Sequence, residues 1–252
     1  MATIFFLCAM VFFAGFVDAA AGGGGLISLP AYLFTGAPAH VALGSNKFSS
    51  SCGATFSAGR FFAKGAMDLK AALLAAASSF VGSIIGARAV LYVDAEALRV
   101  ILAAVLPVAA GVILFKRGYG ERNLSGRLSK RTATALSLSI GFLTGAYDGL
   151  LGPGAGSFAI IAFTALMKYD LKTASGNAKV LNLASNYGSL AVFALSGTVD
   201  YAIALPAGLC SIAGHYIGAG YAIKRGAAFI RPLMIFVMAL LFCKILFDVF
   251  VK

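Results

Sequence analysis

The sequence predicts an all-α polytopic membrane protein made of two inverted repeats. Three observations predict this fold: the apolar composition, the lengths of the apolar segments, and an internal repeat. Hydrophobic residues make up 60% of the 252 positions and charged residues 12%, with a mean hydropathy of +0.93. A soluble globular domain has about 25% charged residues. This chain therefore has too few polar groups to cover a water-exposed surface.

The apolar segments have the length of membrane helices, since about 20 residues span a bilayer. Helices are expected because an irregular backbone or an open strand cannot face lipid. Glycine-rich stretches interrupt the first segment at residues 22–25 and the fifth at residues 152–156. Each repeat is thus predicted to be a glycine-broken hairpin of two short helices plus three spanning helices, giving about eight full helices and up to about ten segments. The segments are residues 3–36, 39–62, 69–92, 97–115, 132–167, 171–195, 201–223 and 229–250.

The repeat is visible as a constant spacing between matching residues. Lys47 and Lys179 are 132 positions apart, and so are Asp68 and Asp200. Internal duplication of this kind is typical of transporters. The matches are Gly44-Ser45-Asn46-Lys47 with Gly176-Asn177-Ala178-Lys179, Gly65 and Asp68 with Gly197 and Asp200, and Gly82 and Gly86 with Gly214 and Gly218.

Basic residues in the gaps predict the orientation. The linker at residues 116–131 carries six basic side chains against Glu121 alone, so it is predicted to be cytoplasmic. If each hairpin returns to its starting side, the basic gaps at residues 60–70, 168–172 and 224–231 are also cytoplasmic and both termini are external. Equivalent gaps of the two repeats then lie on opposite faces of the inner membrane, which makes the repeats inverted. The predicted domains are a first membrane repeat at residues 1–116, a basic cytoplasmic linker at 117–130, and a second, inverted repeat at 131–252.

The net charge of +11 is not taken as evidence for nucleic-acid binding. The basic residues lie mostly between apolar segments, where they orient helices and contact anionic lipid headgroups. The cysteines have no paired spacing, and the sequence contains neither a metal-binding pattern nor a phosphate-binding loop. We therefore expect the lipid bilayer as a partner, and no nucleic acid, metal or cofactor.

The glycine breaks are the first candidate for a substrate site. Consecutive glycines disfavour regular helix by about 1 kcal/mol each relative to alanine, and they permit unwound backbone close to a ligand. The helix that follows each break would present free N–H groups to an anion. The alternative is that glycines only let helices pack closely. Whether the hairpins cross the bilayer or re-enter stays open. The candidate residues are Gly23, Gly24, Gly25, Gly154 and Gly156.

Two intramembrane lysines are the second candidate. Lys47 and Lys179 each lie well inside an apolar segment, beside Asn46 and Asn177 respectively. A lysine at such a depth disfavours insertion by about 3 kcal/mol, so it is expected to face a cavity or a partner. The alternative is a side chain that extends to the membrane interface. Two lysines near two helix N-termini make a positive locus, which predicts a small anionic substrate.

Three further polar residues have open roles. Asp18 and Asp148 flank the glycine breaks, where they could pair with the lysines, relay protons or cap a short helix. His215 is intramembrane and could respond to protons or serve as a hydrogen-bonded packing residue. All three are candidates for proton coupling.

The order of these motifs is similar to that of the sulfite exporter TauE/SafE family of membrane permeases. The motifs are the stretch from Gly15-Phe16 through Gly22-Gly23-Gly24-Gly25-Leu26-Ile27 to Pro30, then Gly44-Ser45-Asn46-Lys47, Gly65-x-x-Asp68 and Gly82-x-x-x-Gly86. The resemblance covers nearly the whole chain. It implies a small anionic substrate such as sulfite, a sulfonate or an organic carboxylate. The second break, Gly152-Pro153-Gly154-Ala155-Gly156, departs from the all-glycine pattern, so the two breaks are not expected to be equivalent.

The sequence predicts a secondary transporter that moves its anion by alternating access, with the site at the midplane between the halves. The alternative is an anion channel that uses the same positive side chains. An intramembrane enzyme is not expected, because no nucleophile and base are paired in one segment. The substrate, the direction, the coupling ion and a homodimeric state stay open.

Overall fold

The structure is a computed structural model that describes residues 2–89 and 120–250, apart from the side chains of Arg127 and residues 244–250. The segment expected at residues 97–115 lies outside the described residues. Within the described part the chain is helical throughout, as predicted. The elements are α1 (Ala2–Ala21), α2 (Gly25–Phe34), α3 (Ala39–Ala63), α4 (Leu69–Ala89), the short 3₁₀ helix η1 (Ser125–Arg127), α6 (Lys130–Leu150), α7 (Ala155–Met167), α8 (Leu171–Leu195), α9 (Tyr201–Arg225) and α10 (Ala227–Phe250).

Both glycine-rich stretches interrupt helices. Gly22 and Gly23 have φ of 73° and 83°, and Gly154, which precedes α7, has φ of 87°. Only glycine adopts this region at little cost, so these residues permit the chain to leave one helix and start the next. The limbs of each hairpin are unequal: α1 has 20 residues and α2 has 10, while α6 has 21 and α7 has 13. The expected pair of short helices is therefore corrected to one long limb and one short limb.

Three helices of the described part are long and apolar enough to cross a membrane: α1, α4 and α9. The helices α3 and α8 have 25 residues each, as many as α9, but their polar side chains lower their hydropathy. Most of those polar side chains, among them Lys47 and Lys179, are buried inside the protein. A hydropathy criterion therefore misses the two helices that carry the buried lysines.

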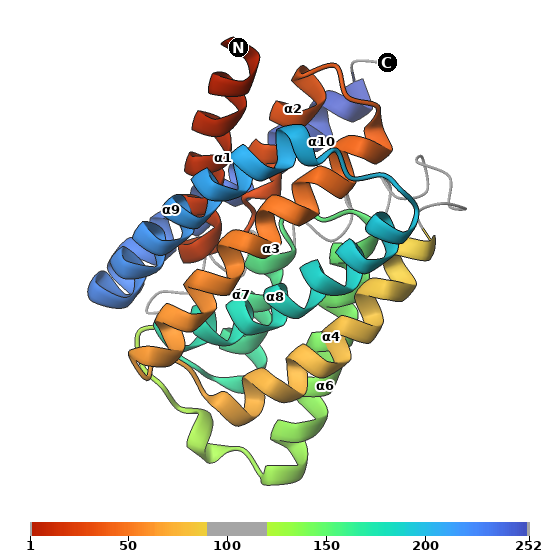
Figure 1. Ribbon diagram of the computed structural model, residues 1–252. Coiled ribbons are helices and arrows are strands. Elements are labelled where there is room, and N and C mark those ends of the chain that lie inside the picture. The colour runs from red at the N-terminus through yellow and green to blue at the C-terminus, as the bar shows by residue number, and fades with distance from the viewer. Residues whose placement is uncertain (1, 90–119, 251–252) are drawn as a thin grey trace.

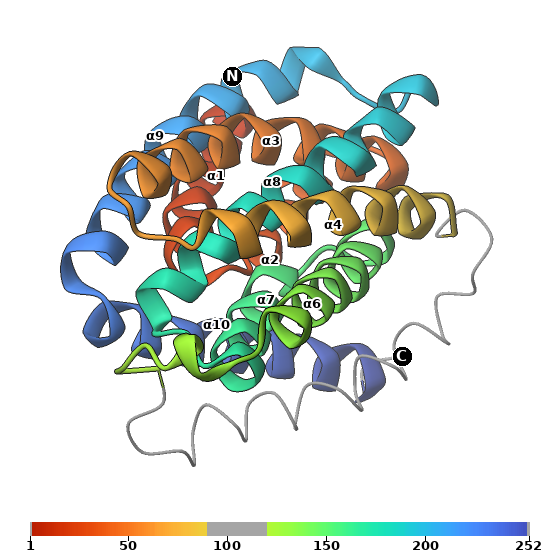
Figure 2. The same ribbon diagram turned by 90° about the horizontal axis from the view of Figure 1, so that it is seen from below.

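The helices of the two halves pack on each other. The helix α4 packs on α6 and α8, and α9 packs on α1 and α3, while α3 and α8 contact each other in the middle (Figures 1 and 2). Helix α4 matches α9 in the repeat, and α6 matches α1, so the same set of contacts occurs twice. Most of the packing among the described helices thus joins one half to the other.

Glycines allow these close helix contacts. A Cβ atom at Gly82 or Gly86 of α4 would overlap the backbone of α6, and one at Gly214 or Gly218 of α9 would overlap the backbone of α1. Small residues permit such close approach of backbones in membrane proteins. The packing role of these glycines distinguishes them from the glycines of the two breaks.

Candidate functional site

Two buried ion pairs join the halves at the centre of the molecule. Lys47 of α3 is 4% exposed, and its Nζ lies 2.8 Å from Oδ2 of Asp148 in α6. Lys179 of α8 is 1% exposed and forms an ion pair with Asp18 of α1. Neither lysine extends to a surface. Each lysine is thus neutralised by an aspartate of the opposite half.

Polar side chains of α8 form hydrogen bonds with the pair Lys47–Asp148. Besides the carboxylate, Lys47 Nζ donates to the backbone oxygen of Asp148 at 3.0 Å and to Oδ1 of Asn186 at 3.2 Å. The hydroxyl of Ser185 donates to Asp148 Oδ2 at 2.5 Å. Asp148 is 4% exposed, so these contacts are made away from bulk water.

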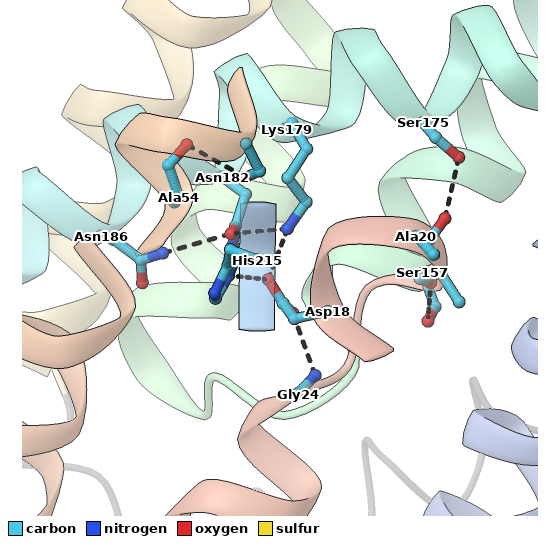
Figure 3. A network of polar contacts seen from close by, with 12 residues as sticks. Asp18, Ala20, Gly24, Ala54, Ser157, Ser175, Lys179, Asn182, Asn186 and His215 are labelled. Atoms are coloured by element: carbon cyan, nitrogen blue, oxygen red, sulfur yellow. Dashed lines mark hydrogen bonds and ion pairs between the residues drawn. The ribbon is translucent and has the colours of Figure 1, made fainter. Parts of the chain in front are cut away.

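The pair Lys179–Asp18 has different neighbours (Figure 3). Asp18 Oδ1 accepts a hydrogen bond from the backbone N–H of Gly24 at 2.9 Å, which ties the aspartate to the glycine break. Nε2 of His215 lies 3.2 Å from Asp18 Oδ2, and its Nδ1 lies 3.2 Å from the hydroxyl of Ser211. Nδ1 also lies 3.0 Å from the backbone oxygen of Ser211, so each ring nitrogen faces an oxygen that can accept a hydrogen bond from an N–H group.

Two asparagines of α8 connect the ion pairs. Asn186 Nδ2 donates to Asn182 Oδ1 at 3.2 Å, and Lys179 Nζ donates to the same oxygen at 3.4 Å. The charges of the two lysines and the two aspartates cancel. The expected positive locus is therefore corrected to a charge-balanced network, and of the roles left open for the two aspartates the structure shows pairing with the lysines.

A cavity with about 520 Å³ of space free of atoms, part of it open to solvent, lies where the two glycine breaks approach each other. Gly25 and Gly156, in the first turns of α2 and α7, line it, and so do both aspartates. Helix N-termini favour anions because their first N–H groups have no acceptor within the helix. Here Leu26, Ile27 and Ala155 already donate to backbone oxygens of the glycine breaks, and Gly25 and Gly156 are the first-turn residues on the cavity wall. The predicted site residues on its wall are Asp18, Gly23, Gly25, Asn46, Lys47, Asp148 and Gly156.

Other predicted site residues lie off this wall. Gly24 and His215 line a smaller neighbouring hollow that also touches Asp18. Lys179 lies behind Asp18, and the Cα of Gly154 faces Leu241 and Phe158. These four residues contact the cavity only through their neighbours.

Asn177 is remote from the cavity. Its Oδ1 accepts a hydrogen bond from the backbone N–H of Asp68 at 2.8 Å, at the start of α4. Its counterpart Ser45 accepts one from the backbone N–H of Asp200 at 3.0 Å, at the start of α9. Successive helical residues are about 100° apart, so Asn177 points about 200° away from Lys179. The structure thus places Asn177 as a helix-start acceptor for the opposite half.

Sequence reasoning left out Ser185, Asn182 and Asn186 as site residues. Asn182 and Asn186 follow Lys179 by three and seven positions, a spacing that places them on the same helix face. That spacing was a usable signal for polar residues near Lys179. Nothing in the sequence indicates that Asn186 reaches across to Lys47.

Comparison with known proteins shows which family the chain resembles. Residues 7–245 match the protein family described as Sulfite exporter TauE/SafE. The chain belongs to this family. The chain is 36% identical over 247 residues to the probable membrane transporter protein YfcA of Escherichia coli (strain K12), which covers 97% of this chain and 89% of YfcA.

Two further relatives carry similar names. The probable membrane transporter protein ORF9 of a Sinorhizobium species is 34% identical over 243 residues, covering 96% of this chain and 92% of that protein. A probable membrane transporter protein of Haemophilus influenzae (strain ATCC 51907 / DSM 11121 / KW20 / Rd) is 32% identical over 237 residues, covering 94% of this chain and 92% of that protein. No solved structure matches the chain.

Family membership establishes the broad class of the protein. It is a multi-pass membrane protein and a transporter, and it is not an enzyme.

Proposed function

We propose that the protein is a secondary transporter that carries a small anion across the inner membrane by alternating access. The observation that carries this proposal is the pair of buried Lys–Asp contacts between the halves, beside a cavity where two broken helices approach each other. Buried ionisable groups in a membrane protein mark a substrate or ion pathway, because they are otherwise too unfavourable to retain. Broken helices at the interface of two repeats have the same significance.

Four groups are proposed to hold the anion. Lys47 supplies the positive charge, and Asn46 supplies an amide on the cavity wall. The first turns of α2 and α7, at Gly25 and Gly156, supply backbone N–H groups at the positive ends of two helix dipoles. An anion with several oxygens could accept from these groups together.

The two halves are proposed to lie inverted in the bilayer, with the linker at residues 116–131 cytoplasmic and both termini external. The repeated cross-half packing of α4 and α9 supports a two-fold relation between the halves. In Figure 1 the start of α1 and the end of α10 lie at one end of the molecule, and η1 lies at the other. This arrangement agrees with termini on one side and the linker on the other, and it fits the excess of basic residues in the linker.

The proposed substrate class is a small sulfur oxyanion, sulfonate or carboxylate. The family description names sulfite export. Amide and backbone donors beside a lysine suit oxyanions of this size without distinguishing sulfur from carbon at the anion centre.

Uptake into proteoliposomes tests the proposal. Purified protein is screened by thermal shift against sulfite, sulfonates and dicarboxylates, since a ligand that prefers the folded state raises the melting temperature. The strongest binder is then used for uptake. Lys47→Met should abolish uptake, whereas Lys64→Met, at the exposed end of the same helix, should not change it.

Two outcomes would contradict parts of the proposal. Uptake by Lys47→Met at the wild-type rate would show that the buried pair does not bind the substrate. Flux that neither saturates with anion concentration nor shows exchange of internal for external anion would identify a channel in place of a transporter.

A further inference from the structure

The ammonium group of Lys47 has no hydrogen left for an added ligand. An ammonium group has three N–H donors. They are directed at Oδ2 of Asp148 at 2.8 Å, at the backbone oxygen of Asp148 at 3.0 Å, and at Oδ1 of Asn186 at 3.2 Å. An anion that binds Lys47 must therefore displace one of these acceptors. The carboxylate of Asp148 is the acceptor that carries negative charge, so it is the one an anion can replace in kind.

An unpartnered polar atom lies beside this contact. Asn46 is 8% exposed and lines the cavity, and its side-chain Oδ1 is buried without a hydrogen-bond partner in the described part of the chain. Buried polar groups of proteins are nearly always satisfied, so an exception needs an explanation. A ligand in this cavity that carries a hydrogen-bond donor, or an amide turned to donate to an oxyanion, would satisfy Asn46.

A displaced Asp148 could not stay ionised where it is. Its side chain is 5% exposed, and without Lys47 it would keep the Ser185 hydroxyl as its side-chain partner. An unpaired buried charge is strongly unfavourable in a low-dielectric interior. A proton on Asp148 removes that charge. The site then has the same total charge before and after the anion binds.

We propose that Asp148 is the coupling group of the transporter, and that each anion bound by Lys47 enters together with one proton bound by Asp148. This inference rests on the proposed function. It assigns a proton as the coupling ion and excludes uncoupled binding of the anion to Lys47. The transported unit is neutral for a monovalent anion, which suits passage of the closed site through the bilayer.

Among the described residues, Lys47 is the only ionisable side chain that forms a hydrogen bond or an ion pair with Asp148. The helix α6 packs on α4, α7 and α8. Lys70 and Arg88 of α4 are exposed, and α7 has no titratable side chain. From α8, Ser185 and Asn186 face the carboxylate, and Lys179 of the same helix is paired with Asp18. Tyr147, the neighbour in α6, donates to the backbone oxygen of Pro153 at 2.7 Å.

In the pair Lys179–Asp18, a bound anion cannot replace the aspartate on the lysine in the same way. Asp18 keeps contacts with His215 and with the Gly24 N–H in addition to Lys179, and Lys179 does not line the cavity. Displacing Lys179 would therefore neither expose it to the ligand nor leave Asp18 without partners. The coupling role is assigned to the pair on the cavity wall.

Anion affinity as a function of pH tests this inference on the full chain in lipid nanodiscs. The probes are methanesulfonate and acetate, the smallest sulfonate and a small carboxylate, titrated by thermal shift from about pH 5.5 to about pH 8.5, where both stay largely ionised. Wild-type affinity should fall as the pH rises, by up to about tenfold per pH unit where one proton is taken up with each anion. Asp148→Asn resembles the protonated carboxyl, so its affinity should vary by less than about twofold over the range.

Two more variants and one direct measurement complete the design. Glu121→Gln makes the same chemical change in the exposed linker and should keep the wild-type slope. In Asp18→Asn the anion affinity should also fall as the pH rises, because Asp148 is still present. Wild-type protein in weak buffer with a pH-sensitive dye should take up about one proton per anion bound at the alkaline end of the range. That measurement needs no variant, so it holds even where Asp148→Asn does not fold.

The outcomes separate the inference from the proposed function. Stabilisation by a probe that is independent of pH, or binding without proton uptake, overturns the coupling role of Asp148 and leaves anion transport standing. If the pH dependence of anion affinity is lost in Asp18→Asn and kept in Asp148→Asn, the proton belongs to the pair Lys179–Asp18. That result overturns the inference. No stabilisation by either probe at any pH, in any variant, overturns the proposed substrate class and the inference together.

Discussion

The two Lys–Asp pairs hold equivalent positions in the repeat but have different surroundings. Lys47–Asp148 lies on the cavity wall, with Ser185 and Asn186 as neighbours. In Lys179–Asp18 only the aspartate reaches that wall, Lys179 lies behind it, and His215 contacts the aspartate. The duplication therefore supplies the ion pair twice, and the neighbouring side chains decide which lysine a ligand can reach.

The source of the difference is visible at matching positions of α3 and α8. Ser185 and Asn186 of α8 correspond, 132 positions earlier, to Gly53 and Ala54 of α3. A Cβ atom at Gly53 would overlap the ring of His215 and the hydroxyl of Ser211. The small residues of α3 therefore make room for the histidine, and the polar residues of α8 take its place at the other pair.

The largest effect is expected from breaking the pair on the cavity wall. Lys47→Met leaves Asp148 buried without its counter-charge, so we expect a loss of about 3–5 kcal/mol in stability. The double variant Lys47→Met with Asp148→Asn removes both charges and should recover most of that loss. Thermal unfolding of the detergent-solubilised protein measures both. A double variant as unstable as the single one would show that the loss comes from packing and not from charge.

Breaking the second pair should have a smaller effect. In Lys179→Met the carboxylate of Asp18 keeps the N–H of Gly24 and the ring of His215. A lost hydrogen bond to a charged group amounts to about 1.5–3 kcal/mol. The same thermal unfolding measurement ranks the two lysine variants. If Lys179→Met is the less stable of the two variants, Lys47–Asp148 is not the pair that contributes more to stability.

The space around His215 can be tested through glycine. Gly53→Ala should overpack this position and lower stability by about 1–3 kcal/mol. Gly59→Ala, on the same helix with open space around it, is the matched control and should be neutral or raise stability by about 0.5–1 kcal/mol. Equal melting temperatures for the two alanine variants would mean that α3 is free to shift away from the histidine.

The smallest effect is expected at the acceptor for the start of α4. Asn177→Ala removes the oxygen that accepts from the Asp68 N–H and should lower stability by about 1 kcal/mol. Anion affinity in the thermal-shift titration should be unaffected, because Asn177 is remote from the cavity. A weakened affinity at unchanged stability would return Asn177 to the binding site, as its place in the sequence motif suggested.

Much of the central site follows from the sequence because burial of charge in an apolar segment is so restrictive. Lys47 and Lys179 had to face a partner or cavity, and Asp18 and Asp148 were among few candidates for pairing. The glycine stretches had to interrupt helices, since their composition disfavours continuous helix. These conclusions depend on local composition alone.

What the sequence could not provide is the pairing between elements. Helical periodicity tells which residues share a face, but not which helix that face contacts. For this reason the crossing of each lysine to the aspartate of the other half, and the contact from Asn186 to Lys47, came only with the structure. The position of Asn177 away from the cavity has a simpler cause, since two residues two positions apart in a motif point to different sides of a helix.

The crossed contacts also bear on how the protein is made. Lys47 in the first half finds its counter-ion in α6, and the start of α4 finds its acceptor Asn177 in α8. When the first half leaves the ribosome, Lys47 therefore has no counter-ion and the start of α4 has no acceptor from α8. Both contacts form only after the second half has been inserted. We therefore expect that neither half folds by itself. Synthesised as two separate polypeptides, the halves should accumulate in the membrane only when both are produced in the same cell.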